Sequence, residues 1–206
     1  MKLHKYESYE EYKAIQVKHN HRKLTSVWEW EVAVEFISKC LKEFLGEVTS
    51  GICHGTRGGK EQEWFRKYLD GADVIGTEIS DTATQFPHTV EWDFHEVKEE
   101  WISSFDFVFS NAFDHAYDPE KALKAWARCL KPGGYLILHW STEHNETGSK
   151  RDPFAATLGE YIDMLSALGF DLRDIRKTPR MEAPSFALFF TKGANLQTVI
   201  RDDDAV

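Results

Sequence analysis

The stretch VTSGICHGTRGGKEQEWFRKYLDGADVIGTE, which runs from Val48 to Glu78, contains the pattern that decides the fold. An apolar strand pattern ends at His54, a glycine-rich turn follows, and an amphipathic helix pattern covers Lys60–Leu69. A second strand pattern covers Asp73–Glu78. Two short strands separated by a helix form a parallel pair with a crossover connection, so this stretch predicts a parallel sheet covered by helices.

The alternation of strands and helices continues outward from this stretch. We expect further strands at Val90–Trp92, Phe105–Ser110, Tyr135–Trp140, Phe170–Ile175 and Ser185–Thr191. We expect further helices at Pro119–Leu130 and Pro153–Leu168. Apolar residues at helical spacing also run through the first part of the chain, up to Leu45. We therefore expect a single domain over 1–206, with 1–45 as an N-terminal helical cap, 46–192 as the α/β core and a frayed acidic tail over 201–206.

Composition restricts the class of protein. The 206 residues carry a formal net charge of −9, and 42% are hydrophobic, which is typical of a soluble globular chain. Because acidic chains repel phosphate backbones, we expect no nucleic-acid partner; the only candidate basic patch, His19–Lys23, is short. Three cysteines without CxxC spacing and a charged start favour the reducing cytoplasm. No apolar run approaches the ~20 residues of a membrane span.

The glycine-rich turn leaves two interpretations open. Its sequence, ICHGTRGGK over residues 52–60, lets the backbone approach a ligand closely and places a helix start beside it. A phosphate-binding P-loop would need Ser or Thr where Glu61 stands, and Arg57 interrupts the dinucleotide pattern GxGxxG. The turn therefore predicts either a ligand loop of another kind or a simple strand-to-helix connection.

Glu78 ends the second strand pattern, 23 positions after Gly55. An acidic side chain about 20 residues beyond a glycine turn is where parallel α/β sheets bind the two hydroxyls of a ribose. A solvated glutamate at a strand end is the alternative, and the spacing favours the ribose.

Three later motifs carry a family resemblance. FDFVFSNAFDH over 105–115 is followed by DPEKAL over 118–123 and LKPGGYLIL over 130–138. In this order they resemble class I S-adenosylmethionine-dependent methyltransferases, in particular the methyltransferase type 11 branch, and the resemblance covers Glu47–Trp140. It implies an α/β fold: a doubly wound, Rossmann-like three-layer sandwich with a mainly parallel seven-stranded sheet and a terminal antiparallel strand. It also implies S-adenosyl-L-methionine as the cofactor.

The resemblance assigns cofactor-binding roles by position. It implies contacts from Gly55, Thr56 and Gly59 to the methionine part, from Glu78 to the ribose, from Ile79, Asp93 and Phe94 to the adenine, and from Asn111 and Ala112 below the sulfonium. For Asp93, a role as a helix N-cap is an equal alternative.

The sequence departs from the family at the first motif. Cys53 stands where an acidic residue is usual, and Arg57 replaces a glycine. Glu61 or His54 could compensate for the missing acid, and Arg57 could point outward. This departure supports a rival hypothesis, a catalytically silent methyltransferase-like domain that acts through a protein partner. A nicotinamide-dependent reductase is a second rival, which the failed GxGxxG pattern disfavours.

His115 is the candidate general base, because it follows the Phe105–Ser110 strand and histidine titrates near neutral pH. Asp114 could orient or replace it, and a packing role for His115 is the alternative. His139 and His144 are second candidates. With Asp114 these two histidines could suggest a metal site, but they lack HxxxH or HxH spacing, so no metal is expected.

The methyl acceptor is expected to be an oxygen or nitrogen of a small molecule. Asn111–Asp114 lacks the Asp/Asn-Pro-Pro-Tyr/Phe motif of base methylation. Acceptor specificity should come from the N-terminal helices and the loop Ser141–Asp152. Aromatic residues of the N-terminal part could form a lid over the site or only a packed helix face: Tyr6, Tyr9, Tyr12, Trp28 and Trp30.

Overall fold

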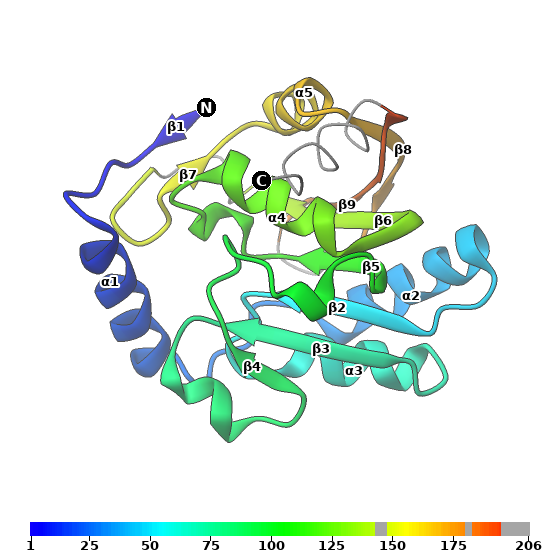
Figure 1. Ribbon diagram of the computed structural model, residues 1–206, viewed down its shortest axis with the longest axis horizontal. Coiled ribbons are helices and arrows are strands. Elements are labelled where there is room, and N and C mark those ends of the chain that lie inside the picture. Colours follow the sequence, from blue (N-terminus) through cyan, green and yellow to red (C-terminus); the bar gives the residue numbers. More distant parts are fainter. Residues whose placement is uncertain (143–147, 180–182, 195–206) are drawn as a thin grey trace.

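The computed structural model describes residues 1–142, 148–179 and 183–194 (Figure 1). The strands are β1 (Lys2–Leu3), β2 (Ser50–His54), β3 (Asp73–Glu78), β4 (Thr89–Glu91), β5 (Phe105–Ser110), β6 (Leu130–Ser141), β7 (Phe154–Ala155), β8 (Phe170–Lys177) and β9 (Ser185–Lys192). The helices are α1 (Tyr9–Arg22), α2 (Glu31–Leu45), α3 (Lys60–Tyr68), α4 (Pro119–Cys129) and α5 (Leu158–Ala167), with short 3-10 turns η1 (Asp81–Gln85), η2 (Glu99–Trp101) and η3 (Phe113–His115).

The main sheet has seven strands in the order β4-β3-β2-β5-β6-β9-β8. The pairs from β4 to β6 are parallel, whereas β9 is antiparallel to both β6 and β8. This arrangement confirms the expected Rossmann-like sheet with its terminal antiparallel strand. The chain order reverses between β2 and β5, and ligands of open parallel sheets bind outside the carboxyl ends of the strands at such a point.

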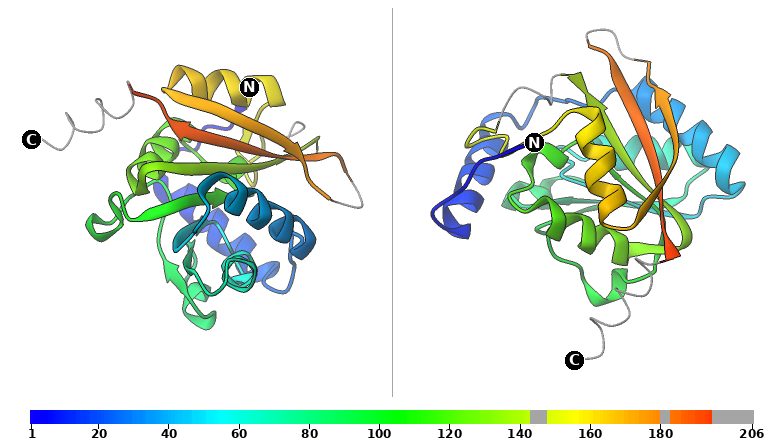
Figure 2. Two further views of the ribbon diagram at one scale, coloured as in Figure 1. Left: turned by 90° about the vertical axis from the view of Figure 1, so that its right-hand side faces the viewer. Right: turned by 90° about the horizontal axis from the view of Figure 1, so that it is seen from above.

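Helices cover both faces of the sheet, as Figure 2 shows. On one face, Val34, Ile37 and Leu41 of α2 and Phe65 of α3 pack in one apolar cluster with Phe107 of β5. On the other face, α4 and α5 pack against the sheet in a second cluster that contains side chains such as Trp126, Tyr161 and Leu136. Strand β5 is buried except for the half-buried Asp106, because both of its faces are covered.

Several expected boundaries differ from the structure. The strand expected over Tyr135–Trp140 begins already at Leu130, and the one expected over Phe170–Ile175 runs to Lys177. The expected helix over Pro153–Leu168 begins only at Leu158, because Thr157 and Glu160 form a capping box that starts α5 there. The residues before it form β7, which pairs antiparallel with β1. The segment 1–45, expected to form one cap, has two separate positions. Helix α2 packs on the sheet, and only the part before it, with α1, covers the strand ends.

Helix α1 has a polar buried face. Its buried residues, Tyr12, Gln16 and Asn20, follow one another at four-residue spacing and lie on one side of the helix. An apolar core would need apolar side chains at these positions, so this face indicates that α1 covers a polar site. Among the described residues, no helix combines the length and apolar character that a bilayer crossing requires.

Candidate active site

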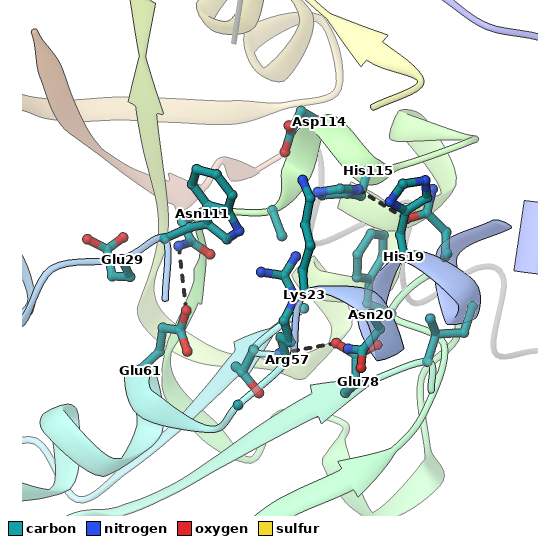
Figure 3. Close-up of a pocket in the computed structure, with 18 of the residues that line it drawn as sticks. His19, Asn20, Lys23, Glu29, Arg57, Glu61, Glu78, Asn111, Asp114 and His115 are labelled. Carbon is teal, nitrogen blue, oxygen red and sulfur yellow. Dashed lines mark hydrogen bonds between the residues drawn. The ribbon is translucent and has the colours of Figure 1, made fainter. Parts of the chain in front are cut away.

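A cavity of about 290 Å³ lies at the carboxyl ends of β2, β3 and β5, under α1 (Figure 3). It is lined by the turn after β2, by Glu78 at the end of β3 and by Asn111 directly after β5. The other wall comes from α1 and from residues 151–152. The cavity therefore lies at the edge of the sheet where the topology predicts a ligand.

The turn after β2 approaches the cavity with its backbone. The N–H groups of Gly55 and Thr56 both donate to the carbonyl of Thr77, at 2.9 and 3.0 Å, which fixes the turn on β3. Gly55 has φ +77°, and a Cβ there would lie 2.7 Å from Cβ of Ala112. Gly55 and Thr56 line the cavity, as expected of a ligand loop. Gly59 does not line it; a Cβ at Gly59 would instead meet Gln62 at 2.9 Å.

Glu78 is a buried carboxylate and not a solvated one. Its side chain lines the cavity, and the residue is only 7% exposed. One oxygen accepts from the backbone N–H of Arg57 and the other from that of Ser80, each at 3.1 Å. Burial raises the pKa of Glu78. Each oxygen keeps a further lone pair, so the carboxylate can still accept two hydroxyl groups.

Ile79, Asp93 and Phe94 line the cavity next to Glu78. The carboxylate of Asp93 accepts from the backbone N–H of His95 at 2.9 Å and from the hydroxyl of Tyr9 at 2.8 Å. No helix follows Asp93, so the N-cap alternative is wrong, although the side chain does close a local turn. Its contact with adenine stays a prediction.

Glu61, and not His54, supplies an acid near the position that Cys53 leaves without one. Cys53 and His54 are buried away from the cavity, and the ring of His54 stacks on Trp126 at 5.0 Å. Glu61 lies in the first turn of α3, lines the cavity and receives a long hydrogen bond of 3.5 Å from the amide of Asn111. Burial raises the pKa of Glu61 to about 8. Arg57 acts on Glu61 electrostatically, but no cation of the described residues forms an ion pair with it, so the buried carboxylate can bind the ammonium group of a ligand.

Arg57 points into the cavity and not outward (Figure 3). Its backbone has φ +40°, which is an unfavourable conformation for a residue with a side chain. One guanidinium nitrogen donates to the carbonyl of Ser26 at 3.4 Å, and the buried Nε has no hydrogen-bond partner among the described residues. Backbone strain together with an unsatisfied donor is typical of a functional position.

His115 is oriented as a base would be. Its Nδ1 lies 3.1 Å from two acceptors, the side-chain oxygen of Gln16 and the carbonyl of Arg151. Because both partners accept, Nδ1 carries the proton of the neutral ring, which leaves the lone pair on Nε2. Nε2 lies 3.8 Å from a carboxylate oxygen of Asp152. Asp152 can thus stabilise the charge that His115 gains when it accepts a proton.

Asp114, His115 and Asp152 have ligand atoms within 4.8 Å of one another, and they are the group among the described residues that could hold a metal ion. Arg57 interacts electrostatically with both Asp114 and Asp152. Because a cation already acts on these two carboxylates, the arrangement favours an organic ligand over a metal.

His139, a second candidate base, also lines the cavity, but both of its ring nitrogens already have partners. Its Nδ1 lies 2.6 Å from the buried carboxylate of Glu29, and its Nε2 lies 2.8 Å from the hydroxyl of Thr178. This pair ties the segment after α1 to β6. His144 lies outside the described residues. Of the five N-terminal aromatic residues, only Tyr12 and Trp28 line the cavity.

Sequence reasoning gave no site role to several polar residues of the cavity wall, among them Gln16, Asn20, Lys23, Glu29, Arg151 and Asp152. The one available signal was the polar four-residue spacing on α1. Arg151 and Glu29 meet their partners across more than 30 positions of sequence, so no local pattern indicates them.

Comparisons with known proteins agree with this geometry. A family model described as a methyltransferase domain matches residues 52–138, which run from β2 into β6. This match spans less than half of the chain and shows a resemblance to that family over the strands that border the cavity. The sequence comparison with curated proteins gives no match.

Solved structures of several methyltransferases share the fold of this chain. The 1,6-didemethyltoxoflavin-N1-methyltransferase of Burkholderia thailandensis, with bound 1,6-didemethyltoxoflavin and S-adenosylhomocysteine, has a TM-score of 0.72 at 18% identity, over 92% of each chain. The magnesium protoporphyrin IX methyltransferase of Synechocystis, with bound cofactor, has a TM-score of 0.60 at 11% identity, over 92% of this chain and 100% of the other. The sugar N-methyltransferase KedS8 of Streptoalloteichus has a TM-score of 0.60 at 14% identity, over 85% and 92%.

The residues present fit S-adenosylmethionine, the family's cofactor. Glu78 offers two acceptors for ribose hydroxyls, and the buried Glu61 offers a carboxylate for an ammonium group. Thr56 Oγ1 is buried without a hydrogen-bond partner among the described residues, so it has free capacity for a ligand at the turn. The altered turn after β2 thus has an acid nearby, Glu61, and a polar group, the hydroxyl of Thr56, that is free for a ligand.

Proposed function

We propose that the protein transfers a methyl group from S-adenosylmethionine to an oxygen or nitrogen of a small molecule. The observation that carries the proposal is the convergence of Glu78, Glu61 and His115 on one cavity. The solved structures with this fold support a small acceptor, since they include methyltransferases named for a didemethyltoxoflavin, a magnesium protoporphyrin and a sugar. Three free, buried cysteines support the further proposal that the protein works in the reducing cytoplasm.

The cofactor supplies a methyl group that its sulfonium already activates, so the protein has mainly to position the acceptor. With the cofactor bound, the acceptor atom would bond to the methyl carbon, and the electron pair of the broken carbon–sulfur bond would stay on sulfur. His115 accepts the acceptor's proton on Nε2, and the hydrogen bonds from Nδ1 hold the ring in place. Asp152 then stabilises the protonated ring.

The first test is calorimetric titration with S-adenosylmethionine, S-adenosylhomocysteine and a nicotinamide dinucleotide. We expect both adenosyl ligands to bind and the dinucleotide to fail. Glu78→Ala should weaken adenosyl binding about 10- to 100-fold, because hydrogen bonds to a buried carboxylate are lost. If neither adenosyl ligand binds the wild-type protein, the proposal is wrong and the silent-domain hypothesis gains support.

The second test concerns the base. In a screen of small hydroxyl and amino compounds, formation of S-adenosylhomocysteine should fall about 10²- to 10⁴-fold in His115→Gln, with unchanged adenosyl binding. Asp152→Asn should lower the rate less and shift its pH profile. A His115→Gln variant that transfers methyl groups at the wild-type rate would return His115 to a packing role.

A further inference from the structure

One half of the cavity contains positive charges that the cofactor roles do not use. Lys23 directly follows α1, and Arg151 follows the loop after β6; both line the cavity. Lys23 belongs to the short basic patch His19–Lys23. Neither Lys23 nor Arg151 has a carboxylate within 4.0 Å among the described residues, whereas Lys60, another lining cation, pairs with Glu63 at 2.7 Å.

These cations line the same cavity. Lys23 and Arg151 both act on the His19 imidazole, whose pKa is lowered by its burial and by their charges. In Figure 3 the side chains of Lys23 and Arg57 both point into the cavity between Asn111 and His115. Like charges that share a partly buried site repel one another unless an anion joins them.

The surroundings hold both cations in place. The carbonyl of Arg151 accepts from the Gln16 amide at 3.0 Å and lies 3.1 Å from Nδ1 of His115. The ammonium of Lys23 lies over the ring of Trp28, 5.0 Å from its centre. The backbone of Arg151 is therefore fixed beside the candidate base, and its exposed side chain lines the same cavity.

We propose that the acceptor carries an anionic group, a carboxylate or a phosphate, which Lys23 and Arg151 bind while His115 faces the atom that is methylated. This inference rests on the proposed function and narrows its substrate class. Asp114 and Asp152 are the carboxylates of the same half, and they lie on the His115 side, where they act on the base and on Arg57. Arg57 belongs to the turn after β2, on the cofactor side. The anion is therefore assigned to Lys23 and Arg151.

The test uses the full chain saturated with S-adenosylhomocysteine, titrated with inorganic phosphate, with benzoate and with its neutral partner benzamide at constant ionic strength. We expect saturable binding of benzoate or phosphate, and benzamide to bind about tenfold more weakly or not at all. Lys23→Gln and Arg151→Gln should each weaken anion binding about tenfold and leave adenosylhomocysteine binding unchanged. The control Lys13→Gln changes an exposed lysine on the same helix and should have no effect.

Each contrary outcome has a meaning. Equal binding of benzoate and benzamide, or saturable binding of neither anion, overturns the inference. If Lys23→Gln and Arg151→Gln weaken adenosylhomocysteine instead, the cations bind the cofactor's own carboxylate and the inference is also wrong. If the wild-type protein binds no adenosylhomocysteine, the proposed function fails first, and anion binding by the free protein is then judged separately.

Discussion

Glu61 makes the binding of the amino-acid part of the cofactor depend on pH. Its carboxyl group is buried at the cavity, which raises its pKa to about 8. An ammonium ligand needs the ionised form, so a proton must leave Glu61 on binding. With this pKa, about 3% of Glu61 is ionised at about pH 6.5 and about half at about pH 8. Affinity should therefore rise about 16-fold over this range, or by about 1.6 kcal/mol.

The assay is calorimetric titration with S-adenosylhomocysteine in two buffers of different ionisation enthalpy. Near pH 7 about 0.9 proton should be released per ligand, because that fraction of Glu61 is protonated before binding. Two controls isolate the group. 5′-Methylthioadenosine lacks the ammonium and should bind with no such pH dependence, and Glu61→Gln should bind the full ligand weakly without releasing this proton.

Two results would refute this reasoning. One is affinity for adenosylhomocysteine that stays flat between about pH 6.5 and about pH 8. The other is an equal pH dependence for methylthioadenosine, which would place the titrating group beside the ribose, where burial also raises the pKa of Glu78.

Three further predictions concern stability and metals. Because the folded-state pKa of Glu61 lies above its usual value, its stabilising contribution is lost as pH rises from about 4.5 through about 8. In urea titrations the free energy of unfolding of Glu61→Gln should therefore exceed that of the wild type by up to about 4 kcal/mol at about pH 8. Equal pH dependence of the two proteins would contradict this. Gly55→Ala should cost about 1–3 kcal/mol in the same assay, because its Cβ would meet Ala112, and it should cost more than Gly71→Ala, where a similar positive φ has nothing within 4 Å. Mg²⁺, Mn²⁺ and Zn²⁺ should leave the melting temperature unchanged, because Arg57 already acts on Asp114 and Asp152; a rise that Asp152→Asn abolishes would establish a metal site.

The core and the cofactor side of the cavity could be predicted because their signals are local. Strand β5 has the predicted bounds, since six apolar or small residues between turn signals leave little choice. Glu78 and Asn111 follow strand ends, and parallel strands bring their carboxyl ends to one edge. The position of a residue relative to its strand was enough to place these side chains at the cavity.

The acceptor side could not be predicted, because its contacts join distant segments. Gln16 of α1 meets Arg151 and His115, and no pattern within either segment indicates this. The expected helix start at Pro153 was wrong because the capping box of Thr157 and Glu160 competes with proline as a start signal. Similarly, whether Glu61 can supply the acid that is missing at Cys53 depends on which face of α3 is turned toward the cavity.

The polar buried face of α1 has a consequence for motion. A helix that contributes few apolar side chains to a core gains little from burial, so detaching it costs less than detaching α2 or α4. Ligands could then enter and leave by transient release of α1, without any rearrangement of the sheet. Backbone amides of α1 should exchange with deuterated water quickly in the free protein and slow down once both ligands fill the cavity beneath it.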